Sequence, residues 1–100
     1  MKPYNVKLLT ITCEILAQKN IIGILKKYEI TGYTIFEVGG KGEHGLRHHG
    51  LKNEKNIKIE VIMREEKLSG IVEEISRTMF ANFSLVLYVS DVGVIRTEKF

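Results

Sequence analysis

The chain has 100 residues, of which 44% are hydrophobic and 27% are charged, a composition typical of one globular domain. Its single cysteine, Cys13, excludes an internal disulfide and every zinc site that needs two thiolates. No apolar run approaches the ~20 residues that cross a bilayer, and residues 1–5 lack the core of a signal peptide, so we expect a cytoplasmic protein. The net charge of +3 permits anionic partners without requiring nucleic acid, because 12 acidic residues are interspersed with 15 basic ones.

The first part of the chain predicts a strand, a helix and a second strand. Residues 6–13 (VKLLTITC) are rich in β-branched and apolar side chains, which is typical of a buried strand. Residues 14–28 change to a helical period, with Ile15, Ile22 and Leu25 on one stripe and lysines on the opposite side. Thr31 and Gly32 end this helix, and residues 33–38 (YTIFEV) predict the second strand.

The last part of the chain repeats this order. In residues 57–63 (IKIEVIM) every second side chain from Ile57 to Met63 is apolar, with Lys58 and Glu60 on the other face, which predicts a strand with one buried face. Apolar residues between Leu68 and Met79 recur at helical spacing and predict a helix that faces the core. Residues 84–90 (SLVLYVS) are apolar on both faces, so we expect a strand that is central in its sheet or covered by another subunit.

Together these elements predict one α+β domain over residues 1–100, a ferredoxin-like βαββαβ sandwich with both helices on one face of the sheet. We expect the other face to be apolar, because the strands carry more apolar side chains than two helices can cover. Exposed apolar surface of this kind is typical of subunit contacts, so the sequence predicts an oligomer. The residues from which we infer this surface are Leu9, Ile11, Tyr33, Ile35, Leu87 and Val89.

The segment from residue 39 to residue 56 shows neither period, and loops of this length inside a compact domain usually have a function or are disordered. It holds five of the nine glycines and all three histidines. Glycines at a strand end let backbone N–H groups turn toward an anion, and an arginine can bind a phosphate through two hydrogen bonds. The run from Gly39 to Gly42, followed by Arg47, is therefore either a phosphate-binding turn or a solvated loop.

The same segment offers an alternative, because His44, His48 and His49 could together bind a metal ion. Gly40, Gly42 and Gly45 match GxGxxG, but the helix that a dinucleotide site needs after the glycines is missing from the pattern. No set of residues with the spacing of a catalytic site is present, and Cys13 has no histidine near it in the sequence. The sequence therefore favours a binding protein over an enzyme.

Several short motifs follow one another along the chain: TGYT at residues 31–34, GGKG at 39–42, then Arg47 and Gly50, NIKIEV at 56–61 and LYV at 87–89. In this pattern the chain resembles the PII-like signalling proteins. It is most similar to the subgroup that regulates bicarbonate transport or accompanies carbon-fixation genes. The resemblance extends over nearly the whole chain.

The resemblance implies a homotrimer with a nucleotide site in each of the three clefts between subunits, and a long T-loop between strands two and three that touches the regulated partner. The implied ligand is an adenine nucleotide: cyclic AMP, AMP, ADP or ATP. The implied phosphate contacts come from the loop, at Gly39, Gly40, Lys41, Gly42 and Arg47. The turn at Phe83, Ser84 and Leu85 is implied to offer backbone contacts to the adenine of a neighbouring subunit.

One departure concerns His44, which stands where members of this subgroup often carry a second arginine. We therefore expect phosphate binding here to be weaker or to depend on pH. The resemblance further implies a regulator that is not an enzyme, with no obligatory cofactor. No nucleic-acid partner is expected, because residues 57–63 lack the aromatic side chains on which bases stack. Its implied partner is a membrane transporter or a metabolic enzyme, and a transporter would recruit the protein to the membrane.

Overall fold

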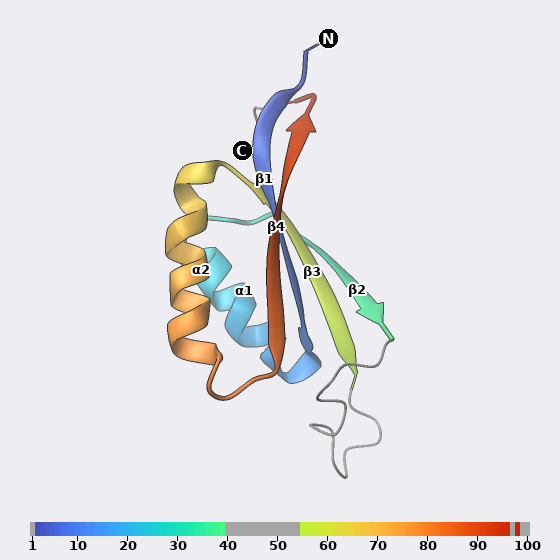
Figure 1. Ribbon diagram of the computed structural model, residues 1–100, viewed down its shortest axis with the longest axis vertical. Coiled ribbons are helices and arrows are strands. Elements are labelled where there is room, and N and C mark those ends of the chain that lie inside the picture. Colours follow the sequence, from blue (N-terminus) through green and yellow to red (C-terminus); the bar gives the residue numbers. More distant parts are fainter. Residues whose placement is uncertain (1, 40–54, 97, 99–100) are drawn as a thin grey trace.

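Four strands form one antiparallel sheet in the spatial order β2-β3-β1-β4, with both helices on one side of it (Figure 1). The computed structural model describes residues 2–39, 55–96 and 98. Along the chain the elements are β1 (Tyr4–Glu14), the 3-10 turn η1 (Ile15–Ala17), α1 (Gln18–Lys27), β2 (Thr34–Val38), β3 (Asn56–Met63), α2 (Glu65–Met79) and β4 (Leu85–Val94). This is the predicted ferredoxin-like βαββαβ order, with the long segment between β2 and β3 where a T-loop is expected. None of the helices in the described residues is long and apolar enough to cross a membrane.

The core lies between the helices and one face of the sheet. Strand β3 alternates between half-buried and buried residues along its whole length, as its sequence predicts. Residues that the register places opposite one another, such as Leu9 and Val61 or Ile11 and Ile59, share this buried face. Helix α2 contributes the apolar stripe that the 3.6-residue period predicts. The stripe predicted for α1 was wrong except for Leu25: Ile15 is exposed in the 3-10 turn and Ile22 is only half-buried, because α1 begins later than predicted and so buries Ile21 and Ile24. The buried members are Leu9, Ile11, Cys13, Ala17, Ile21, Ile24, Leu25, Ile30, Ile57, Ile59, Val61, Met63, Ile71, Ile75 and Met79.

The prediction of which residues form the uncovered face was wrong. Leu9 and Ile11 are fully buried beneath the helices, and Ile35 and Leu87 pack against the same core. The register pairs Val89 with Leu9, so Val89 lies on that side too, although at the exposed edge of β4. The physical reason is parity: successive side chains of a strand point to opposite faces, so residues two apart share a face. The register places the five of these residues that lie in strands on the same face. Tyr33 precedes β2 and is exposed.

An uncovered apolar face is nevertheless present, and the even-numbered residues form it. We call it the helix-free face, and the side chains that define it are Leu8, Thr10, Phe36, Ile62, Val86 and Tyr88. Val86 is 61% exposed, Tyr88 49% and Phe36 40%, although all three are large and apolar or aromatic. Thr10 lies at the centre of this face and is only 1% exposed, because side chains of the flanking strands surround it.

Two element boundaries differ from the predicted ones. Glu14 was expected to begin the first helix, but it ends β1, and a 3-10 turn separates it from α1. Strand β4 continues beyond Ser90 to Val94, because β1 begins at Tyr4 and its first residues pair with this end of β4. Helix α1 ends at Lys27, and two residues later Glu29 has a φ of 63°, in the left-handed region that normally favours glycine.

Candidate functional site

The described ends of the long segment, Gly39 and Lys55, and the turn before β4 lie at one end of the sheet, where β2 and β1 end and β3 and β4 begin (Figure 1). The TGYT motif lies at the opposite end of β2. The register aligns Val38 of β2 with Asn56 of β3, and Asn56 with Glu14 of β1. Ser84 directly precedes β4, and its backbone N–H donates to Oε2 of Glu14 at 3.0 Å. Four neighbouring strands therefore meet in one row of residues, which we call the end row: Val38, Asn56, Glu14 and Ser84.

The base of the long loop is fixed to the sheet on both sides. Gly39 follows Val38 directly, and on the return side the backbone N–H of Ile15 donates to the carbonyl of Lys55 at 2.8 Å. Lys55 Nζ also lies 3.5 Å from Oε1 of Glu37, on the strand beside it. The remaining predicted loop residues, Gly40, Lys41, Gly42, His44 and Arg47, lie outside the described residues.

Asn56 adds an open acceptor to the loop base. Its side-chain oxygen Oδ1 is buried and has no hydrogen-bond partner among the described residues. An unsatisfied buried acceptor costs free energy, and a nearby N–H donor would satisfy it. The end row thus offers one acceptor between the loop base and Glu14.

The turn between α2 and β4 contains the three residues predicted to meet adenine: Phe83, Ser84 and Leu85. The backbone N–H of Phe83 donates to the carbonyl of Met79 at 2.9 Å, and that of Ser84 is taken by Glu14. These two donors are therefore committed within the subunit. Any backbone contact from Phe83 or Ser84 to a base would use a carbonyl oxygen, which accepts from an amine.

The loop base and this turn lie at opposite edges of the sheet. Gly39 extends from the β2 edge, whereas Ser84 precedes the β4 edge, three strand spacings away. With strands ~4.8 Å apart, this separation is about 14 Å across the end row. A single subunit therefore does not bring the predicted phosphate and adenine contacts together.

A hollow that the sequence did not assign to the site lies on the helix-free face, beside the start of β2. It measures about 500 Å³ and is lined by residues 31–34 and by Leu8, Glu60 and Ile62. Its floor is apolar, and Glu60 adds a carboxylate at the point where the register pairs it with both Thr10 and Thr34. Pockets of this size and mixed lining are typical of small-molecule sites.

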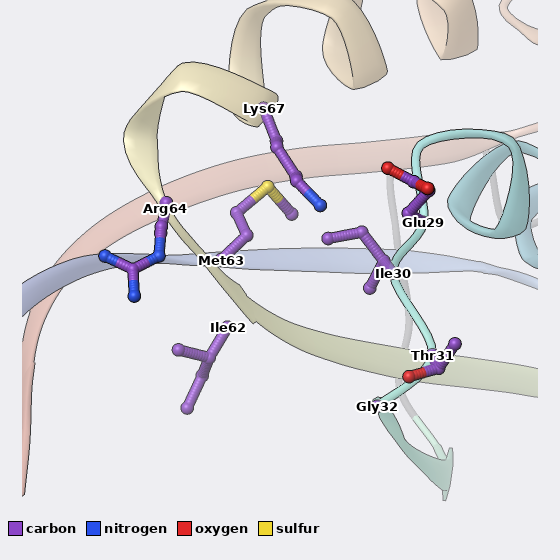
Figure 2. Close-up of a pocket in the computed structure, with 8 residues that line it drawn as sticks. All are labelled: Glu29, Ile30, Thr31, Gly32, Ile62, Met63, Arg64 and Lys67. Carbon is purple, nitrogen blue, oxygen red and sulfur yellow. The ribbon is translucent and has the colours of Figure 1, made fainter. Parts of the chain in front are cut away.

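A smaller hollow of about 100 Å³ adjoins it and shares Thr31, Gly32 and Ile62. Figure 2 shows the side chain of Lys67 extending from the start of α2 toward Ile30, while Arg64 points away. Arg64 is engaged elsewhere, since its Nη1 donates to the hydroxyl of Tyr4 at 3.0 Å.

The described residues contain neither a metal site of three or more histidine, cysteine or acidic side chains nor an exposed cysteine nucleophile. Within residues 2–39, 55–96 and 98, no three histidine, cysteine or acidic side chains gather as metal ligands. His44, His48 and His49 lie outside that range. Cys13 is 1% exposed, and burial raises the pKa of its thiol to about 11, so it remains an uncharged thiol at neutral pH. Cys13 is therefore a small buried apolar residue of the core.

Two elements of the site escaped the sequence interpretation. The hollow on the helix-free face combines residues from β1, β2 and β3 that are far apart in the sequence, so no local motif contains it. The TGYT motif at residues 31–34 could have indicated the hollow, because its residues line that hollow. It was used only for the family resemblance and was assigned no part in the site. Glu14 gave no signal, since it was expected to lie in a helix.

Comparison with known proteins agrees with this architecture. The family model described as nitrogen regulatory protein P-II matches residues 6–99. A PII-like signalling protein of Thermus thermophilus is 32% identical and superposes with a TM-score of 0.82, covering 100% of this chain and 99% of that one. CPII of Thiomonas intermedia K12, a PII-like protein, has been solved with ADP, AMP and acetate; it is 29% identical with a TM-score of 0.84, covering 100% and 98% of the two chains. CPII bound to ADP and bicarbonate is 30% identical over 95% of this chain and 93% of that one, with a TM-score of 0.81. The chain belongs to the P-II family of signalling proteins.

Proposed function

We propose that this protein is a signalling regulator that binds an adenine nucleotide in clefts between its subunits. P-II proteins are signalling regulators, and CPII, which shares the fold at 29% identity, binds ADP and AMP. The observation that carries the proposal is the position of the two predicted contact regions at opposite edges of one sheet end. That arrangement suits a ligand held between two copies of the chain.

The second subunit is proposed to cover the helix-free face. Its exposed side chains include Val86, Tyr88 and Phe36, and apolar exposure of this kind on one face is typical of an interface. We propose a homotrimer, in which every subunit contributes its β2 side to one cleft and its β4 side to the next.

The phosphates are proposed to bind at the loop base. Gly39, Gly40 and Gly42 would let backbone N–H groups face a phosphate, Lys41 would add a positive charge, and Arg47 would bind through two parallel hydrogen bonds. His44 would add a positive charge when it is protonated, so that binding becomes tighter as the pH falls toward 6.

The adenine is proposed to lie between the hollow of one subunit and the turn of its neighbour. Leu8 and Ile62 offer an apolar floor for a flat ring, and Glu60 offers an acceptor for the exocyclic amine. Carbonyl oxygens of Phe83, Ser84 and Leu85 from the neighbour would complete the contacts.

The signal is proposed to leave through the long loop. A nucleotide that binds one loop conformation better than another shifts the loop toward that conformation, and the partner reads the change. The partner is a transporter or a metabolic enzyme, in inorganic-carbon or related metabolism, because CPII is found with bicarbonate as well as ADP. Recruitment to a membrane would then follow from binding a transporter.

Isothermal titration with ADP, AMP, ATP and cyclic AMP tests this function. We expect one nucleotide per subunit, and Arg47→Ala should weaken binding by about 1.5–3 kcal/mol because a charge-assisted hydrogen bond is lost. Arg77→Ala is the matched control, since Arg77 is an exposed helix residue paired with Glu73 and its loss removes the same charge. Equal weakening by both variants would refute the role of Arg47. A folded oligomer that binds none of the four nucleotides would refute the function, and zinc or copper titration would then test the three loop histidines.

A further inference from the structure

Glu14 connects the two parts of the end row that the proposed function places in different clefts. We infer that Glu14 is a positioning residue that transmits an adenine contact at the turn of Phe83, Ser84 and Leu85 to the loop base of the same subunit. This inference rests on the proposed function. It adds a link inside the subunit, which neither the family nor the ligands of the relatives imply.

The geometry of the link follows from the register. Cys13 pairs with Leu85, the first residue of β4, so in this antiparallel register Glu14 lies opposite Ser84, the residue directly before β4. On its other side Glu14 pairs with Asn56 of β3. The Glu14 carboxylate accepts the Ser84 N–H at 3.0 Å, and it therefore fixes the turn where the β-ladder has ended.

The next residue along the chain fixes the loop base. The N–H of Ile15 donates to the carbonyl of Lys55 at 2.8 Å, immediately before β3 begins. Two consecutive residues thus hold the turn on one side and the loop base on the other. A shift at Ser84 reaches Lys55 through the side chain of Glu14 and the peptide unit that joins Glu14 to Ile15.

The hydrogen bond from the Ser84 N–H to the Glu14 carboxylate is of a strong kind, so it can hold the two residues together. A carboxylate that accepts a backbone N–H forms a charge-assisted hydrogen bond, which is stronger than a neutral one. The bond is partly buried, so water replaces it poorly when it breaks. If a neighbour's adenine orders the turn, Glu14 is held more firmly, and the bond from Ile15 to Lys55 opens less often.

Adenosine separates this link from direct contact, because it has a base but no phosphate to bind at the loop. The test is amide hydrogen exchange of Ile15, measured by NMR on the full-length protein with and without adenosine. We expect adenosine to slow Ile15 exchange by about tenfold in the wild type, the change expected when one charge-assisted hydrogen bond controls the opening. Shifts of the Ser84 and Leu85 amides report that adenosine is bound.

Three variants test whether Glu14 carries the effect of adenosine from the turn to Ile15. Glu14→Ala should abolish the effect of adenosine on Ile15, while Ser84 and Leu85 still respond. Glu14→Gln keeps an acceptor oxygen and should restore part of the effect, which a merely structural role of the residue would not predict. Glu73→Ala removes the same charge from an exposed position on α2, and it should behave as the wild type.

The outcomes distinguish the link from the proposed function. If adenosine binds but Ile15 exchange does not change in the wild type, or changes equally in Glu14→Ala, the link is wrong and nucleotide binding stands. If ADP binds while adenosine leaves Ser84 and Leu85 unmoved, the adenine contact at the turn is wrong and the link falls with it. If neither binds, the proposed function itself fails.

Discussion

The two faces of the sheet are formed by the same strands, yet they have different chemistry. On the helix-covered face, residues such as Leu9 and Ile59 are fully buried in a continuous core. The helix-free face carries exposed apolar side chains such as Val86 of β4. It also has a hollow of about 500 Å³. One face therefore explains why the subunit folds, and the other has features suited to assembly and ligand binding. Substitutions at matched positions on the two faces test this division.

The largest effect is expected from a charge on the helix-free face. Val86→Asp should convert the proposed trimer to monomers, because burying an unpaired carboxylate in an apolar interface costs several kcal/mol. Val89→Asp is the control, since Val89 lies on the same edge strand at 45% exposure but on the other face. Sedimentation velocity measures both. If Val86→Asp remains as large as the wild type, the helix-free face is not the interface.

A core substitution should come next in size. Ile59→Ala is expected to lower the free energy of unfolding by about 2–5 kcal/mol, because Ile59 is fully buried and leaves a cavity between the sheet and the helices. Ile62→Ala, on the same strand but the opposite face, should cost clearly less. Urea denaturation at one fixed protein concentration makes the comparison. Equal losses from the two variants would show that the faces do not differ in this way.

The smallest of the three effects depends on pH. Burial raises the pKa of Cys13 to about 11, whereas an unfolded thiol titrates near 8.5. The buried thiol therefore contributes stability that is complete below about pH 8.5 and is lost as the pH rises toward 11. The loss amounts to about 3 kcal/mol at most. The difference in unfolding free energy between wild type and Cys13→Ala should be constant up to pH 8 and shrink above it; a difference that stays constant to pH 11 would contradict a buried neutral thiol.

Much of the fold could be predicted because each element has a clear local signal. The alternation in β3 and the helical spacing in α2 were sufficient to assign both elements, and their order determined the topology. The parity error arose because alternation shows that a strand has two faces, but not which face meets the helices. Glu14 was misassigned because the apolar residues that follow it fit a helical period from the first position, whereas the chain first makes a 3-10 turn.

The site was less predictable than the fold for a related reason. Its described parts are held together by pairings between residues far apart in sequence, such as Glu14 with Ser84 and Ile15 with Lys55. No local period reports such pairings. The loop residues Lys41, His44 and Arg47 were assigned from composition and resemblance, and their roles remain predictions. Arg47→Ala tests the role of Arg47.

Native mass spectrometry in the presence of ADP is the most direct test of nucleotide binding between subunits, because one spectrum reports both the number of subunits and the number of nucleotides. We expect a trimer that carries up to three ADP molecules, and we expect Val86→Asp to lose both assembly and binding. Folded monomers that bind ADP would show that the site does not need a second subunit. A trimer that binds no ADP would contradict the proposed nucleotide clefts.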